Sequence, residues 1–250
     1  EDAIFKTVTF ENVCLTDETS IIEWNNGTIK SVTVSNYTNT SDEDRVGVIK
    51  NNRSRILDCT LKDSSVHGNE AVGGFVGNDY EGFIQDCTVK NSFMCGNSDV
   101  GCITGTGDST TIQNSVVTNS HSRGRYSIGG VVGSFEKSAI VKTTVKNSNI
   151  EAVRSTGGIL GEGDRKINIR DCKVQSTQIS SKDTIHCVGD VKSRGEITDT
   201  SISDCKIITK DKNTEIYLFS ETGSITNSFI TDSMIYAQDV TISATNSNIE

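Results

Sequence analysis

The chain has 250 residues, a net charge of −9 and no proline. This negative charge argues against nucleic acid and anionic membrane surfaces as partners, because both attract clustered Lys and Arg. No stretch approaches the roughly 20 apolar residues of a membrane span. We therefore expect no nucleic-acid partner and no membrane insertion.

Residues 1–28 form an irregular first coil of a pattern that later becomes regular. They hold an imperfect copy from Phe5 to Leu15, followed by the only tryptophan, Trp24. No signal peptide is visible at the start, and no capping helix is visible at either end. We predict a single domain over residues 1–250, with regular coils from about residue 29 to 250, as part of a longer chain.

From residue 29 onward, an isoleucine recurs every 27 to 29 residues, and the fifth residue after it is always aliphatic. The isoleucines are Ile29, Ile56, Ile84, Ile112, Ile140, Ile169, Ile197 and Ile225. Apolar and small residues alternate with polar ones around each isoleucine, which is the periodicity of a β-strand. Each coil therefore begins with short strands that turn aliphatic side chains to one side.

Asn or Asp usually interrupts the alternation two and seven residues after each isoleucine, as at Asp86 and Asn91. Lys142 and Ser176 are among the exceptions. Asn and Asp tolerate left-handed backbone angles and mark turns. The pattern predicts three short strands joined by two sharp corners, then a looser segment leading to the next glycine-rich strand.

That glycine-rich segment, Gly73-Gly74-Phe75-Val76-Gly77, recurs with both outer glycines every 28 residues. The outer glycines are Gly73, Gly101, Gly129 and Gly157, and Gly77, Gly105, Gly133 and Gly161. A phosphate-binding loop would need a following helix N-terminus, which is missing here. We interpret the glycines as relief of crowding at a tight corner or a close contact between coils.

A fixed period of this size indicates a repeat architecture. Short strands joined by single-residue corners do not form hairpins, but they wind as coils whose equivalent residues stack about 4.8 Å apart. The sequence predicts an all-β fold, a right-handed parallel β-helix (solenoid) with about 28 residues per coil. Aliphatic ladders would fill its interior, and Asn and Asp ladders would follow its corners.

Eight cysteines are present, and none forms a Cys-x-x-Cys pair. Cys59, Cys87 and Cys172 fall at one position of the repeat, where other coils have Ser or Thr. We expect mostly unpaired thiols in the core. Disulfides are the alternative, and Cys95 with Cys102 is the first pair to test.

The Gly-Gly-x-x-Gly segments resemble the GLUG-motif repeats of bacterial and protist surface proteins. The resemblance covers about residues 45–220, with four good copies and degraded ones at Val46-Gly47-Val48 and Val188-Gly189-Asp190. It implies a large, secreted or surface-anchored, adhesin-like protein.

A set of carboxylates follows the glycine segments at intervals close to one coil: Asp79, Glu81, Asp108, Glu136, Glu162 and Asp164. If they line one edge of the rod, they could bind calcium, the one cofactor that the sequence suggests. They could also act as acid and base in glycoside hydrolysis. A solvated edge, partly neutralised by Lys137, Arg165 and Lys166, is the simplest interpretation.

Two tyrosines on the looser segments, Tyr80 and Tyr126, are candidates for contacting a ligand such as a glycan. Four glycosylation sequons lie near the start of the chain, at Asn26, Asn36, Asn39 and Asn52. In a secreting eukaryote they would make this part of the chain a glycoprotein surface.

From these observations we expect an extracellular or cell-surface protein that is not an enzyme. It would act as an adhesin or rigid stalk, with a host-cell surface protein or glycan as its partner. Two alternatives are open: a polysaccharide lyase or glycoside hydrolase that uses the carboxylate edge, and a trimeric spike or fibre segment, which would be a homo-oligomer.

Overall fold

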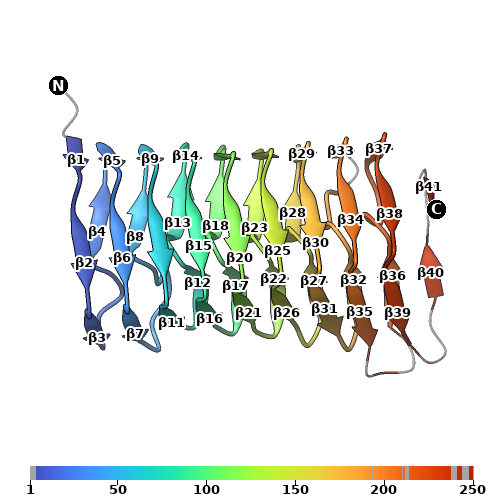
Figure 1. Cartoon of the computed structure of the whole chain (residues 1–250), viewed down its shortest axis with the longest axis horizontal. Coiled ribbons are helices and arrows are strands. Elements are labelled where there is room, and N and C mark those ends of the chain that lie inside the picture. The colour runs from blue at the N-terminus through green and yellow to red at the C-terminus, as the bar shows by residue number, and fades with distance from the viewer. Residues whose placement is uncertain are drawn as a thin grey trace.

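The computed structural model describes residues 4–192, 194–209, 211, 214–237, 241–243 and 248–249. These residues form short β-strands that stack as a solenoid of about 28 residues per turn, with no helix among them. Figure 1 shows the coils following one another along the long axis, from the N-terminal to the C-terminal end. The predicted all-β parallel solenoid is confirmed, while its right-handed winding stays a prediction.

The isoleucine-centred part of each coil supplies three parallel sheets, as predicted. Sheet A consists of β1 (Ile4–Lys6), β5 (Thr28–Lys30), β9 (Arg55–Leu57), β14 (Phe83–Gln85), β19 (Thr111–Gln113), β24 (Ala139–Val141), β29 (Asn168–Arg170), β33 (Glu196–Thr198) and β37 (Ser224–Thr226). Sheet B consists of β2 (Thr9–Glu11), β6 (Thr33–Ser35), β10 (Thr60–Lys62), β15 (Thr88–Lys90), β20 (Val116–Thr118), β25 (Thr144–Lys146), β30 (Lys173–Gln175), β34 (Ser201–Ser203), β38 (Phe229–Thr231) and β41 (Asn248–Ile249). Sheet C consists of β3 (Cys14–Thr16), β7 (Thr38–Thr40), β11 (Ser65–His67), β16 (Phe93–Cys95), β21 (His121–Arg123), β26 (Asn149–Glu151), β31 (Gln178–Ser181), β35 (Lys206–Thr209) and β39 (Met234–Tyr236).

The glycine-rich part of each coil supplies two further sheets, D and E. Sheet E consists of β12 (Glu70–Gly73), β17 (Ser98–Gly101), β22 (Tyr126–Gly129), β27 (Ser155–Gly157), β32 (Thr184–His186), β36 (Glu215–Tyr217) and β40 (Thr241–Ser243). Sheet D consists of β4 (Ile22–Asn25), β8 (Ile49–Asn52), β13 (Val76–Tyr80), β18 (Thr104–Asp108), β23 (Val132–Glu136) and β28 (Leu160–Asp164). The glycine segment is therefore a turn between two strands, and not the single strand that we predicted.

The core is built from the predicted ladders. Ile84 of sheet A pairs in register with Ile56 and Ile112, and Val89 of sheet B pairs with Leu61. All four isoleucine and leucine side chains named here are fully buried. Burial of one such side chain stabilises a fold by about 1.5–3 kcal/mol, so regular stacking of identical side chains holds the coils together.

The corners after sheets A and B have the predicted left-handed backbone. Asp86 and Asn91, for example, have φ angles of 55° and 50°. In most coils the residue after the corner is small and buried, and its side chain replaces the ladder hydrogen bond that the corner interrupts. Ser92 accepts the backbone N–H of Ser64 at 3.2 Å and donates to the carbonyl of Lys90 at 2.8 Å.

Cysteine performs this corner role in several coils. The Sγ of Cys87 lies 3.2 Å from the carbonyl oxygen of Gln85, the equivalent of the serine contact. All eight cysteines are free thiols in the structure, so the expected unpaired state is confirmed and Cys95 is not bonded to Cys102.

The repeated glycines let the backbones of sheets D and E touch. A Cβ on Gly105 would lie 2.2 Å from the carbonyl carbon of Ala71 in sheet E, and one on Gly133 would lie 2.2 Å from that of Asp99. A Cβ on Gly73 would meet the oxygen of Val76 across the turn at 2.0 Å. The glycines therefore serve close backbone packing, as the sequence predicted.

Candidate functional site

One row of side chains follows the ends of the sheet D strands, where each strand enters its corner. Tyr80, Asp108, Glu136 and Asp164 pair in register along this row. The residues that follow them have left-handed backbones, and they are Glu81, Ser109, Lys137 and Arg165. We call these eight residues the charged strip.

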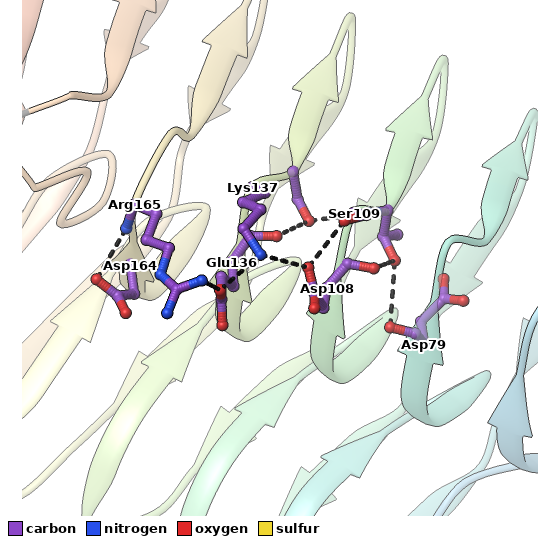
Figure 2. A network of polar contacts seen from close by, with 9 residues as sticks. Asp79, Asp108, Ser109, Glu136, Lys137, Asp164 and Arg165 are labelled. Atoms are coloured by element: carbon purple, nitrogen blue, oxygen red, sulfur yellow. Dashed lines mark hydrogen bonds and ion pairs between the residues drawn. The ribbon is translucent and has the colours of Figure 1, made fainter.

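The charged strip contains its own counter-ions. Lys137 Nζ lies 3.0 Å from Glu136 and 4.0 Å from Asp108, and Arg165 lies 2.6 Å from the same oxygen of Glu136. Figure 2 shows Lys137 extending toward Asp108 and Glu136, and Arg165 extending toward Glu136. Cationic side chains therefore occupy the space between these carboxylates.

The six predicted carboxylates do not line one edge. Asp79 is fully buried and belongs to the inward row of Gly107 and Phe135, while Glu162 belongs to the row of Ser134. Within the described residues, no group of three or more His, Cys, Asp and Glu side chains is placed to hold a metal ion. The prediction that all six carboxylates line one edge is therefore wrong. Asp108, Glu136 and Asp164 share a row, and Glu81 lies at the adjacent corner.

Asp79 instead ends a ladder of buried amides. Asn25 donates to Asn52 at 2.6 Å, and Asn52 donates to Oδ1 of Asp79 at 2.8 Å. Oδ2 of Asp79 is buried and has no partner. Burial raises the pKa of this carboxyl to about 7, against the opposing effect of the hydrogen bond from Asn52.

Tyr80 lies beside an exposed aromatic and cationic group. The guanidinium carbon of Arg53 is 5.4 Å from the ring centre of Trp24 and 5.5 Å from that of Tyr80. Asn78 donates to the Tyr80 hydroxyl at 2.7 Å. Trp24 is 47% exposed, so an apolar ring and several hydrogen-bonding groups face solvent together. Tyr80 was a candidate from the sequence alone, but its contact with Arg53, which belongs to another coil, was not predicted.

Tyr126 lies elsewhere, in β22 of sheet E. Its ring is within 5.6 Å of the guanidinium carbons of both Arg125 and Arg154. The two predicted tyrosines thus lie on different sheets and do not form one site.

Two of the four predicted sequons are inaccessible. The side chain of Asn39 is fully buried and donates to the Tyr37 hydroxyl at 2.9 Å, and Asn52 belongs to the buried amide ladder. A glycan on either would have no room in the folded chain, so these two predictions are wrong. Asn26 and Asn36 are exposed.

A carboxylate pair lies between sheets E and D. The Ser127 hydroxyl donates to Glu162 at 2.9 Å, and the Ser98 hydroxyl donates to Asp99 at 3.3 Å. Asp99 and Glu162 are close enough for their negative charges to interact. Burial raises the pKa of Asp99 to about 6, with the negative charges of Glu162 and Glu70 adding to the effect. Sequence reasoning missed Asp99, because only the left-handed backbone there, at φ 55°, turns it toward the neighbouring sheet.

The repeat changes where sheet D ends. His186 occupies the position of Gly157 in the register of sheet E, is buried, and stacks on Tyr217 with ring centres 5.1 Å apart. Burial lowers the pKa of His186 to about 4, so the ring is neutral. Neither of its ring nitrogens has a hydrogen-bond partner. Lys192, in the following loop, lies 2.9 Å from Asp190 and 3.5 Å from Glu162.

No family model matches the chain, and no curated protein matches it. Among solved structures, it is similar to a Bacteroides ovatus protein assigned as an immunoglobulin A1 protease, at 15% identity and a TM-score of 0.62, over 92% of this chain and 78% of the other. It also matches an endo-xylogalacturonan hydrolase from Aspergillus tubingensis at 12% identity, with a TM-score of 0.36 over 99% and 81% of the two chains. PfbA, a surface adhesin of Streptococcus pneumoniae, matches at 10% identity and a TM-score of 0.25, over 89% and 73%.

These likenesses bear on the fold alone, and they correct one expectation. We expected a protein that is not an enzyme, largely because regular coils display side chains without forming a pocket. A solved protein with this fold, at a TM-score of 0.62, is named as a protease, so the fold gives no ground for excluding an enzyme and the expectation is contradicted. The described residues include no helix long and apolar enough to cross a membrane.

Proposed function

We propose that the protein is an extracellular β-solenoid that binds an extended glycan of a cell surface along the charged strip. The observation that carries the proposal is the exposed group of Trp24, Arg53 and Tyr80 at one end of the strip. Aromatic rings with a polar edge suit ligands that combine apolar faces with hydroxyl groups.

The rest of the strip fits the same class of ligand. Carboxylate, hydroxyl and amino groups follow the aromatic group at the spacing of successive strands, about 4.8 Å. Four rows cover roughly 15 Å, the scale of a short oligosaccharide. The resemblance to GLUG-repeat surface proteins and the exposed sequons at Asn26 and Asn36 support an extracellular location. Association into a homo-oligomer remains a prediction.

The test is a glycan panel probed with the fluorescently labelled protein, followed by affinity measurements on the best ligand. Trp24→Ala and Tyr80→Ala should each weaken binding about tenfold or more, since loss of a buried aromatic contact typically has this effect. Phe93→Ala is the matched control, because Phe93 also packs between rings, those of His67 and His121, but on sheet C. Equal losses in all three variants, or saturable binding that ignores Trp24 and Tyr80, would refute the proposal.

Cleavage of the bound glycan is a second candidate function, favoured by Asp99 and Glu162. Glycoside hydrolases use two carboxyl groups in different environments, one protonated and one ionised, about 5–10 Å apart. Asp99, with its raised pKa, would donate a proton to the leaving oxygen, and Glu162, held by Lys192 and Ser127, would act as base or nucleophile.

Release of reducing ends from the bound glycan would test this second candidate. Asp99→Asn and Glu162→Gln should each abolish the release while leaving binding at Tyr80 intact. Asp86→Asn is the control, since Asp86 is an exposed corner residue outside both the strip and the Asp99 pair. Release that survives both substitutions would exclude the pair as the catalytic groups.

A further inference from the structure

A pocket of about 550 Å³ lies at the C-terminal end of sheet D. Its lining contains five basic side chains and one acidic one: Lys137, Asp164, Arg165, Lys166, Lys192 and Arg194. The whole chain carries a net charge of −9 and only 24 basic residues, so this concentration of cations is local.

The pocket exists because the solenoid changes its cross-section here. Among the described residues, β28 is the last strand of sheet D. The next coil pairs with it only through one isolated β-bridge, between Gly189 and Leu160. The chain then turns inward, where the backbone N–H of Val191 donates to Ser220 Oγ at 2.9 Å. The loop residues Lys192 and Arg194 therefore face the corner residues of the preceding coils across an open space.

The cations of the pocket are only partly neutralised. Glu136 holds Lys137 and Arg165, and Lys192 is shared by Asp190 and Glu162. Among the described residues, neither Lys166 nor Arg194 forms an ion pair, and both are exposed. Lys166 and Arg194 thus remain available to a ligand, whereas the other three cations of the pocket already form ion pairs with carboxylates of the chain.

We propose that this pocket binds an anionic group, a carboxylate or a sulfate, carried by the glycan that lies on the charged strip. The inference rests on the proposed function and specifies its substrate class as an acidic polysaccharide. Lys137 and Arg165 belong to both the strip and the pocket, so one extended chain contacts both. Arg binds planar carboxylates and tetrahedral oxyanions through paired N–H groups, and Lys adds a point charge.

The experiment compares labelled oligosaccharides of equal length in an anisotropy titration with the full chain. The probes are an oligogalacturonate, a sulfated dextran oligomer and a neutral dextran oligomer, with a single-stranded oligonucleotide as a fourth. At least one acidic oligosaccharide should bind about tenfold or more tightly than the neutral one, and its affinity should fall as salt is added.

The double variant Lys166→Gln and Arg194→Gln should remove most of that preference without weakening the neutral probe. Neither substitution leaves a carboxylate unpaired, so the fold is not perturbed by a new buried charge. Lys62→Gln with Lys90→Gln is the matched control, because both lysines are exposed on sheet B. The preference between the oligogalacturonate and the sulfated dextran identifies the carboxylate or the sulfate as the anionic group.

Each negative result separates the two proposals. Equal binding of acidic and neutral oligosaccharides, lost in Tyr80→Ala, would overturn the anionic pocket and leave the glycan strip standing. Binding of free galacturonate or sulfate that depends on Arg194, with no oligosaccharide bound at Tyr80, would overturn the glycan strip and the polysaccharide assignment. Tightest binding of the oligonucleotide would overturn both.

Discussion

Replacement of the buried Asp79 by asparagine should stabilise the protein at alkaline pH. Its carboxyl is fully buried, accepts one hydrogen bond from Asn52, and has an unpartnered second oxygen. Asparagine has nearly the same shape, extends the amide ladder of Asn25 and Asn52, and carries no charge to desolvate.

The magnitude follows from the pKa of Asp79. Burial raises it from 3.8 to about 7, so between these pH values the folded chain retains a proton that the unfolded chain loses. The stability contributed by this group is therefore fully present below pH 4 and falls as pH rises toward about 7. At about 1.4 kcal/mol per tenfold change in acidity, the loss at pH 8 is about 2–4 kcal/mol, with allowance for local relaxation.

Urea denaturation at pH 5 and pH 8 measures this effect. Asp79→Asn should gain about 2–4 kcal/mol over the parent at pH 8 and less than half of that at pH 5. Asp86→Asn, the same substitution at an exposed corner, should stay within about 0.5 kcal/mol at both pH values. An identical gain in stability at both pH values, or no gain at pH 8, would refute the assignment of a buried carboxyl with a raised pKa.

Two further predictions concern the repeat. Gly133→Ala should lower the free energy of unfolding by about 3 kcal/mol or more, because its Cβ would meet the Asp99 backbone. Gly96→Ala should lower it by about 1 kcal/mol, since the neighbouring methyl group of Val72 can move aside. Equal losses in thermal unfolding would disprove backbone contact as the cause. Ser115→Cys should leave the stability nearly unchanged, whereas Ser115→Val should cost about 2 kcal/mol, because valine cannot accept the hydrogen bond that the Cys87 N–H donates to Ser115 at 3.2 Å. Chemical denaturation of both variants measures the difference, and a valine variant as stable as the parent would contradict the prediction.

The fold was predictable from the sequence because a stacked ladder repeats its own residue type. Ile84 and Ile112 must both be apolar, since each covers the other in the core, and Asp86 and Asn91 must both tolerate a left-handed backbone. The repeat of 28 residues makes these requirements visible without any structure. The division of the glycine segment into two strands was not visible, because close packing of two backbones leaves the same glycine signal as a single crowded corner.

The candidate site was predictable only in part. The sequence placed Asp108, Glu136 and Asp164 one coil apart, and the structure pairs them. It did not show that Asp79, a single residue earlier in its strand than Tyr80, points inward, because Phe135, the apolar residue that marks this row, lies two coils further along. Asp99 was missed because the equivalent residues are Ala71 and Ser127, so no residue type recurs at that position. Arg194 was missed because it lies in a loop outside the repeated pattern.

The position of the site follows from what the repeat requires. The central rows of sheets A and B keep apolar side chains through every coil, because a polar substitution there would leave an unsatisfied buried group. The corner row after sheet D changes at every step, from Glu81 through Ser109 to Lys137 and Arg165, although all four adopt the same left-handed backbone. Folding demands only that backbone, which Asn or Gly would adopt with less strain. The fold does not determine the side chains of this row, so they are available for recognition of a ligand. The row leads from the aromatic group of Trp24 and Tyr80 to the basic pocket.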